Sequence, residues 1–422
     1  MTDQLERGIA SVQSTVLDLP PCCIEFSPFH PEYFVVGTYF LDRKDPASGR
    51  SEVAEEGNSD EGEGERKQPQ HRTGSIKVYH VKPEAEKTTL IQTSFQPSAL
   101  LDLHFHQKPD NTGAAVLVAV TSTGTVTFHT LDPLAQPSAP LSDLACRRFE
   151  SVAEDTLILF CAWHPTEHDL MAVTTSDGRV ILARVDLETY DIKGFREIPI
   201  ENELENWFVA LTPTDSTAEG EKAFTILSGG DDAVMRWTSC VFKSDDDVCT
   251  DNEDDLGLAL PYPPATLRNQ HMAGITAILP LPNKLTDGST LLISGSYDDT
   301  IRLFAFKPQH ETYGIRSCRL LAEKNLGGGV WRVKVMHESQ DGKAMTLLVS
   351  CMYAGTRIVR LVNETRDDDG WTFQVLAKFE EHKSMNYGSE FVPGFFCEEG
   401  KERLVISTSF YDKLMCVWRS PV

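Results

Sequence analysis

GSYDDTIRLF, at positions 295–304, is one of three similar stretches in this chain, with GGDDAVMRW at 229–237 and SFYDKLMCVW at 409–418. In each, an aspartate is followed six positions later by an aromatic residue, across alternating apolar positions. The pairs are Asp231 and Trp237, Asp298 and Phe304, and Asp412 and Trp418. An aspartate supports a tight turn, and a period of two indicates a strand with one buried face. The stretches predict a recurring β-hairpin, which is typical of a WD-repeat β-propeller.

Weaker copies of the hairpin extend this pattern along the whole chain. They end at Tyr79, Phe128, Ala183 and Arg360, which gives seven units in total. Successive anchor residues are 49 to 67 residues apart by subtraction, more than the roughly 40–45 residues of a minimal blade. Loop insertions are therefore expected in most blades. The extended segment Val12–Leu19 has no hairpin of its own, so we expect it to supply the outer strand of the last blade.

The predicted fold is all-β: a single seven-bladed WD-repeat β-propeller with acidic loop insertions, forming one domain over residues 1–422. The blades are expected near 20–81, 98–131, 157–187, 206–240, 271–306, 329–362 and 382–419. Two inserts, 42–72 and 244–256, are rich in Gly, Ser, Asp and Glu and poor in aromatic residues. This composition predicts disorder in both inserts.

Composition excludes several classes of function. A net charge of −24 disfavours nucleic-acid binding and favours a cationic partner. No apolar run approaches the roughly 18–20 residues that span a bilayer, and the acidic start MTDQLERGIA is unlike a signal peptide. The ten cysteines show no CxxC spacing, which is typical of reduced thiols. We therefore expect a cytoplasmic protein, monomeric, without membrane insertion and without a cofactor.

Sequence motifs of catalysis and metal binding are absent. The chain has no GxSxG, HExxH, GxxxxGK[ST] or GxGxxG pattern. His104 and His106 alternate onto one face of a predicted strand, but the sequence offers no evident third ligand. A packing role is favoured for these two histidines, and no metal site is predicted. Motif spacing alone favours a scaffold protein.

Four stretches in the C-terminal blades are more specific than the repeat itself. They are AEKNLGGGVWRVKV (322–335), LVSCMYAGTRIV (348–359), EHKSMNYGSEF (381–391) and STSFYDKLMCVW (407–418). In this order they resemble the diphthine methylesterase family, WD-repeat proteins of the diphthamide biosynthesis pathway. The resemblance is closest over 157–418. Phe304 and Phe391 depart from the family pattern.

The resemblance implies an enzyme, a carboxylic ester hydrolase. Its expected reaction is hydrolysis of the methyl ester of methylated diphthine on translation elongation factor 2. The products are methanol and diphthine, which a later step amidates to diphthamide. The alternative is a non-enzymatic WD-repeat adaptor for trafficking or ubiquitin-ligase complexes, because most WD propellers only bind partners.

Propeller connectivity predicts where a site would lie. Loops that enter the inner strands and turns of the central hairpins open on the same face, so they should surround one mouth of the central channel. Aromatic residues on these loops are candidates for binding a trimethylammonium group, which favours aromatic faces near carboxylates. They are Trp207, Tyr297, Trp331, Tyr353, Tyr387 and Tyr411.

Candidates for the hydrolysis itself lie on the same loops. His382 with Asp412 would form a base and its orienting group, Ser384 a nucleophile, and Arg332 or the amides of 327–329 the donors to an oxyanion. A structural role competes for His382 and Asp412, and it is the favoured one. A histidine that enters a WD blade commonly hydrogen-bonds a strand serine and the turn aspartate. The corresponding sets are His382, Ser407, Asp412 and Trp418, and His271, Ser294 and Asp298.

Overall fold

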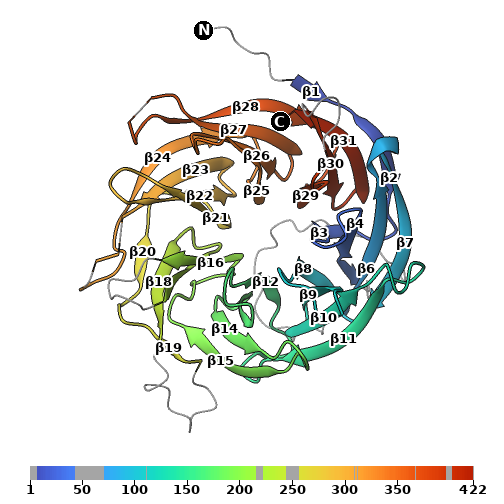
Figure 1. Cartoon of the computed structure of the whole chain (residues 1–422), viewed down its shortest axis with the longest axis horizontal. Helices are drawn as coiled ribbons and strands as arrows, with labels where there is room; N and C mark the ends of the chain where they lie inside the picture. The colour runs from blue at the N-terminus through green and yellow to red at the C-terminus, as the bar shows by residue number, and fades with distance from the viewer. Residues whose placement is uncertain are drawn as a thin grey trace, which may run out of the picture.

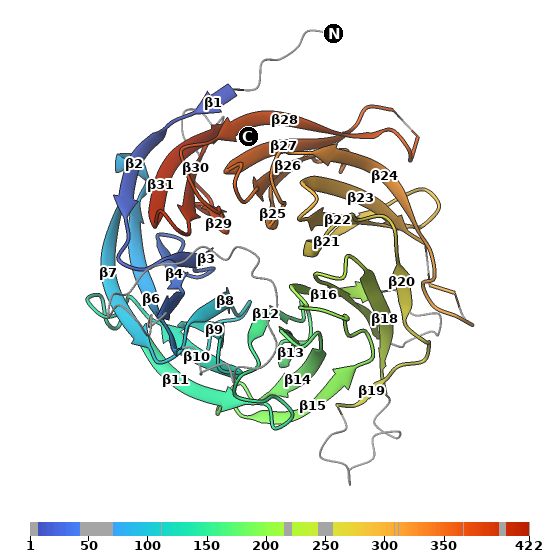
Figure 2. The same ribbon diagram turned by 180° about the vertical axis from the view of Figure 1, so that it is seen from behind.

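The computed structural model describes residues 7–42, 71–110, 112–214, 222–243, 256–307, 309–310, 312–365, 367–395 and 402–421. Seven antiparallel sheets of these residues stand around a central axis and form a closed ring (Figure 1). The same ring seen from behind shows the innermost strand of each sheet facing the centre (Figure 2). The fold is therefore the predicted seven-bladed β-propeller.

Each blade contains four main strands, from the channel outward. Blade one has β3 (Pro21–Phe26), β4 (Tyr33–Thr38), β6 (His71–Lys82) and β7 (Lys87–Gln96), with β5 (Phe40–Asp42) paired to β6 and a short 3-10 helix at Pro83–Ala85. Blade two has β8 (Leu100–Phe105), β9 (Ala115–Thr121), β10 (Thr125–Leu131) and β11 (Leu141–Arg148). Blade three has β12 (Ile158–Trp163), β13 (Leu170–Thr175), β14 (Val180–Val185) and β15 (Ile192–Ile198).

The remaining blades follow the same plan. Blade four has β16 (Phe208–Thr214), β17 (Ala223–Gly229) and β18 (Met235–Phe242), with β19 (Leu258–Ala259) and β20 (Ala265–Leu267) both paired to β18. Blade five has β21 (Ile275–Lys284), β22 (Thr290–Ser296), β23 (Thr300–Phe306) and β24 (Cys318–Asn325). Blade six has β25 (Arg332–Glu338), β26 (Ala344–Ser350), β27 (Thr356–Asn363) and β28 (Trp371–Phe379), and blade seven has β29 (Gly388–Phe391), β30 (Glu402–Ser409) and β31 (Leu414–Pro421).

The N-terminal strands close the ring. β2 (Ser11–Val16) pairs antiparallel with β31 and is the fourth strand of blade seven, as the sequence predicted for 12–19. β1 (Arg7–Ile9) continues onto blade six, where it pairs parallel with β28. Two neighbouring blades made mainly from the C-terminal part of the chain are therefore joined by strands from its beginning.

Apolar side chains fill the spaces between neighbouring blades. Phe379 of blade six stacks on Trp418 of blade seven, with ring centroids 4.9 Å apart and planes at 3°. Trp237 packs edge-on against Phe306 of blade five and donates its indole N–H to the carbonyl of Ile315 at 2.7 Å. The middle strands are buried on both faces, as all seven residues of β23 are, because each face packs against a neighbouring blade. The single buried face predicted from the sequence is therefore wrong for these strands.

The hairpin turn of blade four differs from the prediction by one residue. Asp232 pairs with Arg236 at 2.7 Å, as Asp298 pairs with Arg302 at 2.8 Å in blade five. The residue after each of these aspartates has a positive φ, 59° at Ala233 and 64° at Asp299. The turn aspartate of blade four is therefore Asp232 and not Asp231. Trp237 lies five positions after Asp232, whereas Phe304 lies six positions after Asp298.

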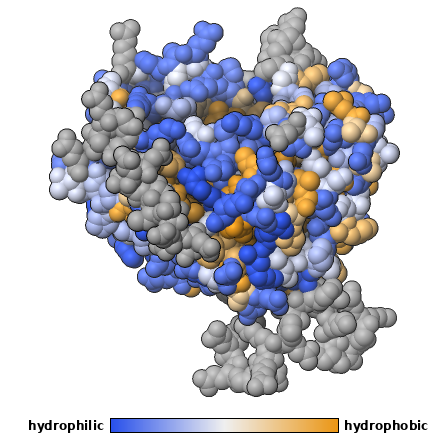
Figure 3. Space-filling model, turned by 60° about the horizontal axis from the view of Figure 1, so that its bottom comes forward, coloured by the Kyte–Doolittle hydropathy of each residue, from blue (hydrophilic) through white to orange (hydrophobic). Residues whose placement is uncertain are grey.

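Most of the two inserts that were predicted to be disordered, 43–70 and 244–255, lies outside the described residues. Within the described part of the chain, no helix is long and apolar enough to cross a membrane. Figure 3 shows one tilted face of the molecule, on which hydrophobic residues form patches within a largely hydrophilic surface.

Candidate functional site

A cavity of about 590 Å³, here called the mouth pocket, opens where entry loops and hairpin turns meet at the channel. Strand β3, the residues around β5 and Leu101 of β8 contribute one part of the lining, and blades three to seven contribute the rest. Its lining consists of Pro20, Cys22, Tyr39, Phe40, Leu41, Arg72, Leu101, Leu157, Leu159, Ser176, Glu205, Trp207, Asp231, Tyr297, Trp331, Tyr387, Phe410 and Tyr411. Residues from distant parts of the sequence are thus brought together by the ring.

Aromatic rings form a continuous wall of the mouth pocket with Trp331 at its centre. The Trp331 ring lies 4.7 Å from Tyr387, 5.6 Å from Trp207 and 5.9 Å from Tyr297, measured between centroids. Phe410 extends the wall, 5.5 Å from Tyr387. Aromatic faces carry negative potential, so a cluster of them attracts a cation that sheds its water easily.

Asp231 supplies a carboxylate beside this wall. The indole N–H of Trp207 donates to its Oδ1 at 2.6 Å, which fixes the carboxylate and the ring relative to each other. Burial raises the pKa of Asp231 to about 6, with smaller contributions from Glu205 and Asp232, while the Trp207 hydrogen bond works in the opposite direction. Asp231 is thus ionised at neutral pH, and it needs only a small fall in pH to become neutral.

The structure brings together five of the six predicted aromatic residues. Tyr353 is the exception, because its side chain is not part of the pocket lining and the residue is 68% exposed on the turn between β26 and β27. The sequence analysis expected the hairpin turns that hold Asp231 and Phe410 at the mouth of the channel, where both line the pocket. It did not name either residue as a binding candidate.

The predicted catalytic set is held in blade seven. His382 Nε2 lies 2.7 Å from the hydroxyl of Ser407, which also accepts the indole N–H of Trp418 at 2.9 Å. Burial lowers the pKa of His382 to about 4, so the imidazole is neutral at pH 7. Asp412 accepts the backbone N–H of Lys383 at 3.0 Å, and Ser384 accepts that of Tyr411 at 2.9 Å.

Blade five repeats these contacts without any proposed chemistry. His271 Nε2 lies 2.7 Å from the Ser294 hydroxyl, and Asp298 accepts the backbone N–H of Met272 at 2.8 Å. Burial also lowers the pKa of His271 to about 4. The shared geometry matches the histidine–serine contact of the structural role favoured above, but Nδ1 of each histidine is buried without a hydrogen bond to the turn aspartate. A catalytic role of His382, Ser384 and Asp412 stays an untested prediction.

Arg332 lies next to the pocket but is not part of its lining. Its guanidinium donates to the carbonyls of Thr276 at 3.1 Å and of Trp331 at 3.0 Å, and it stands 4.8 Å from the Trp331 ring centroid. It also lies 4.9 Å from the ring centroid of Phe160. Burial lowers the pKa of Arg332. The predicted role of Arg332 toward an oxyanion likewise stays a prediction.

A group of ionisable residues lies on the inner strands around Arg332. His104 bridges two carboxylates, with Nε2 2.8 Å from Asp102 Oδ2 and Nδ1 2.7 Å from Glu25 Oε2. Arg332 approaches Asp102 Oδ1 at 4.0 Å, and Lys334 pairs with Glu390. Burial by itself lowers the pKa of His104, but the two carboxylates together raise it to about 10. Opposite charges thus compensate one another in this part of the channel.

His106, the predicted neighbour of His104, lies apart from this group. Its Nδ1 is 2.9 Å from the carbonyl of Lys108, its Nε2 is 2.8 Å from that of His168, and its ring packs on Trp163. This agrees with the packing role favoured for His106. For His104 the neighbours come from other strands, which the spacing of the two histidines could not indicate.

This chain is similar to three proteins that are named for diphthine, although no family model matches it. It is 26% identical over 425 residues to the diphthine methyltransferase homolog of Dictyostelium discoideum, covering 95% of this chain and 97% of that protein. It is 24% identical to the diphthine methyltransferase of Schizosaccharomyces pombe, covering 98% of both chains. The Saccharomyces cerevisiae diphthine methyltransferase is also 24% identical, over 95% of both chains. All three relatives are named for diphthine, and the similarity extends over nearly the full length of each chain.

Solved structures show the same fold at low sequence identity. Saccharomyces cerevisiae Sqt1 aligns over 98% of this chain and all of its own with a TM-score of 0.56 and 11% identity. Chaetomium thermophilum Sqt1, solved with the N-terminus of ribosomal protein L10, has a TM-score of 0.53 and 13% identity over 97% of this chain and 99% of its own. At these identities the likeness establishes the propeller fold alone.

The names of the sequence relatives correct the predicted reaction. They describe transfer of a methyl group, whereas the sequence analysis expected hydrolysis of a methyl ester. The prediction of a methylesterase, and of a carboxylic ester hydrolase, is therefore wrong on this comparison. The error lay in the reaction attached to the resemblance, because the pathway is supported by all three relatives. The adaptor alternative gains no better support from them.

Proposed function

We propose that this chain acts in the diphthamide pathway on translation elongation factor 2, and that its mouth pocket holds the diphthine side chain during the methyl-transfer step named for its relatives. The observation that carries this proposal is the aromatic wall around Trp331 with Asp231 beside it. Diphthine carries a trimethylammonium group, and aromatic faces close to a carboxylate are the surroundings that such a group favours.

The remaining lining suits the rest of the diphthine side chain. Glu205 adds a second carboxylate to the side of the pocket where Asp231 lies, and Arg72 contributes a cation to the same lining. Diphthine has a carboxyl group as well as its quaternary ammonium, so a pocket with both signs of charge can orient it. A volume of about 590 Å³ is also within the usual range of small-molecule sites.

Replacing Trp331 by alanine tests the pocket directly. Trp331→Ala should weaken binding of elongation factor 2 carrying diphthine by roughly five- to thirtyfold, since loss of one well-placed aromatic face costs about 1–2 kcal/mol. Binding is measured by calorimetry, with thermal unfolding of the variant as the test of folding. Tyr353→Ala serves as the matched control, because Tyr353 is exposed and outside the pocket lining. Equal weakening by both variants would contradict the assignment.

The unmodified factor separates recognition of diphthine from general docking. Elongation factor 2 with its unmodified histidine should bind more weakly than the diphthine form, and Trp331→Ala should reduce that difference. If both forms of the factor bind equally well to the native protein, the mouth pocket does not read the modification.

The reaction itself needs a second experiment. The protein is incubated with diphthine-containing elongation factor 2 and an isotopically labelled methyl donor, and the intact factor is weighed by mass spectrometry. Label gained by the factor supports methyl transfer. A factor that stays unchanged, or that becomes lighter by one methyl group, contradicts it even if the pocket binds diphthine.

A further inference from the structure

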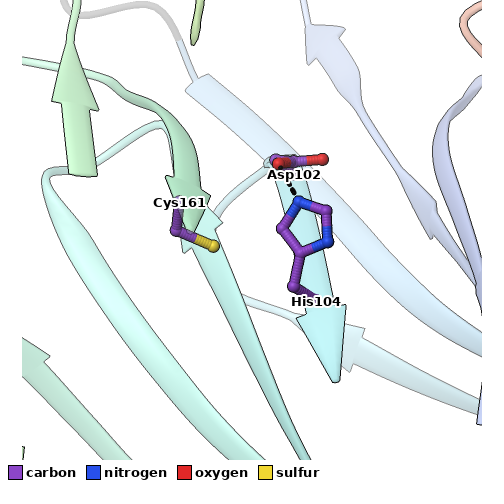
Figure 4. A group of neighbouring side chains, drawn as sticks. All are labelled: Asp102, His104 and Cys161. Carbon is purple, nitrogen blue, oxygen red and sulfur yellow. Dashed lines mark hydrogen bonds and ion pairs between the residues drawn. The ribbon is translucent and has the colours of Figure 1, made fainter. Parts of the chain in front are cut away.

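Three side chains with different donor atoms meet beside the central channel. Asp102 and His104 lie on β8, the inner strand of blade two, and Cys161 lies on β12, the inner strand of blade three. One carboxylate oxygen, one ring nitrogen and the sulfur all lie within 4.8 Å of one another. Figure 4 shows the sulfur of Cys161 pointing toward the ring of His104. A dashed line joins a nitrogen of this ring to the carboxylate of Asp102.

Glu25 fixes the orientation of the imidazole. Its Oε2 lies 2.7 Å from His104 Nδ1, and its Oε1 accepts the backbone N–H of Phe105 at 3.1 Å. Nε2 is thereby left facing Asp102 and Cys161. A carboxylate on one ring nitrogen and a metal on the other is the usual arrangement for histidine ligands of zinc, because the carboxylate sets the tautomer and increases the basicity of the ligand.

The spacing of the three donors is close to that of a tetrahedral site. Zinc bonds of about 2.0–2.3 Å separate neighbouring ligand atoms by roughly 3.3–3.8 Å. The hydrogen bond between His104 and Asp102, at 2.8 Å, would open slightly, and the sulfur would move inward from within 4.8 Å.

The mixture of donors selects the class of metal. Nitrogen and sulfur ligands suit zinc and its neighbours among the first-row transition metals, whereas calcium and magnesium take oxygen ligands. A separate cavity of about 260 Å³ is lined by Glu25, His104, Cys161 and Phe208 among others, so two of the three donor residues border open space. Three protein ligands with an open fourth position are typical of catalytic rather than purely structural zinc.

The charges around the site act in both directions. The carboxylates of Asp102 and Glu25, both hydrogen-bonded to His104, attract a divalent ion to this position. Arg332, 4.0 Å from Asp102, carries a positive charge that opposes it.

We propose that Asp102, His104 and Cys161 bind one zinc-class divalent cation at the channel, with Glu25 as the group that orients His104. This inference does not depend on the proposed function. It revises the sequence-based prediction that the chain has no metal site, which no comparison had tested. Of the two histidines at alternate positions, only His104 is a ligand. Asp102 lies on the same strand, and Cys161 lies on the neighbouring blade.

The test uses the full chain, purified without a polyhistidine tag and freed of metal with a chelator. Zinc is titrated and counted by elemental analysis, and cobalt is used as a spectroscopic probe of thiolate coordination. The native protein should bind one equivalent of either ion, with a sulfur-to-cobalt charge-transfer band. Zinc should also raise the midpoint of thermal unfolding, because it binds the folded state.

Variants assign the ligands. Cys161→Ser should abolish the charge-transfer band, Cys161→Ser and His104→Gln should each weaken zinc binding at least tenfold, and Glu25→Gln should weaken it about ten- to a hundredfold. Cys351→Ser is the matched control, a buried thiol on blade six that should leave the band unchanged. Cys22→Ser excludes the neighbouring thiol pair, whose sulfurs lie 3.6 Å apart.

Two results would overturn the site. The first is that zinc does not bind the native protein in a defined ratio. The second is that zinc binds Cys161→Ser and His104→Gln as tightly as it binds the native protein. Circular dichroism checks the fold of each variant, and if one ligand variant does not fold, Asp102→Asn takes its place. Either negative result would leave Asp102 and His104 as part of an ion-pair network and Cys161 as a buried thiol.

Discussion

Asp231 and Asp232 are adjacent in sequence, but their side chains have different surroundings. Asp232 accepts the backbone N–H of Val234 at 3.0 Å and pairs with Arg236, and these contacts lower its pKa against the effect of burial. Asp231 instead faces the mouth pocket and Trp207. The aspartate that holds the turn is thus distinct from the one available to a ligand, and a shift of one position decides which is which.

The pKa of Asp231 predicts how cation binding depends on pH. The carboxylate titrates near 6 because burial disfavours its charge, so it is ionised at pH 7.5 and about nine-tenths neutral at pH 5. A quaternary ammonium ligand favours the ionised form. Affinity of the diphthine-containing factor should therefore rise with pH through 6, by about three- to tenfold between pH 5 and pH 7.5.

The Asp231→Asn variant provides the comparison for this pH profile. It keeps the size of the side chain and removes its charge, so it should bind weakly and show a flatter profile in calorimetric titrations. Glu205 and Asp232 also carry charge near this group. A native profile that is flat, or an Asp231→Asn profile that retains the full rise, would show that another group controls the affinity.

Individual pocket residues could be predicted only where the repeat fixed their position. The rings of Trp207, Tyr297, Trp331, Tyr387 and Tyr411 lie on loops whose place follows from the order of strands in a blade. Asp231 could not be assigned in this way, since the hairpin of blade four has one residue fewer between its turn and its aromatic residue than blade five has. Local spacing alone gave the wrong aspartate.

At the scale of the element, blade seven contains a hydrogen-bond network that blade five repeats only in part. The hydroxyl of Ser407 serves both His382 and the indole N–H of Trp418. In blade five the equivalent Ser294 serves His271, and the aromatic residue is Phe304, which has no polar atom. The serine hydroxyl therefore makes one more hydrogen bond in blade seven than in blade five, and its loss should cost more stability there.

Ser407→Ala should destabilise the protein more than Ser294→Ala. The first change leaves two buried polar groups without a partner and the second leaves one, at about 1–3 kcal/mol for each group. We expect a loss of about 2–6 kcal/mol for Ser407→Ala and about half of that for Ser294→Ala, measured by urea unfolding. Equal losses, or a larger loss for Ser294→Ala, would contradict the assignment of both hydrogen bonds to Ser407.

The titration of His382 follows from the same network. Its pKa falls from an ordinary value near 6.5 to about 4 in the folded state, so the unfolded chain binds this proton first as pH decreases. The stability associated with His382 is present above pH 6.5 and is lost as pH falls toward 4. His382→Gln should reduce the slope of unfolding free energy against pH by about 1.4 kcal/mol per pH unit in that window. An unchanged slope would exclude a neutral buried imidazole.

Contacts between side chains of neighbouring blades could not be predicted from the sequence. The hairpin repeats predict each sheet and its order around the ring, and they also place the closing strand. They do not specify which side chains of neighbouring inner strands meet, because that depends on the angle and height of one blade against the next. Asp102, His104 and Cys161 illustrate this limit, since β8 and β12 belong to different blades and are more than fifty residues apart.

At the scale of the whole molecule, the ring is closed by strands rather than by a covalent bond. β2 pairs with β31 through Ser11, Gln13, Ser14, Thr15 and Val16, and β1 pairs with β28 of the preceding blade. Glu381 accepts both the backbone N–H and the hydroxyl of Ser11, at 2.9 and 2.5 Å. The beginning of the chain therefore joins two C-terminal blades, and every blade acquires neighbours on both sides.

Removal of these strands should open the ring. A variant that lacks residues 2–16 loses the β2 and β1 pairings, and at about 0.5–1.5 kcal/mol for each net hydrogen bond the loss should reach about 3 kcal/mol or more. Blade seven would then expose the edge of β31, so unfolding should also become less cooperative and the protein more prone to aggregate. The measurement is thermal unfolding followed by circular dichroism and by tryptophan fluorescence, whose midpoints should separate in the variant. A deletion of residues 2–6 alone, which keeps both strands, is the control and should behave as the native protein.

The mouth pocket draws its lining from β3 and from blade seven, on both sides of this closure. Binding of the diphthine-containing factor should therefore weaken together with stability in the longer deletion, and unchanged binding would show that the pocket does not depend on a closed ring.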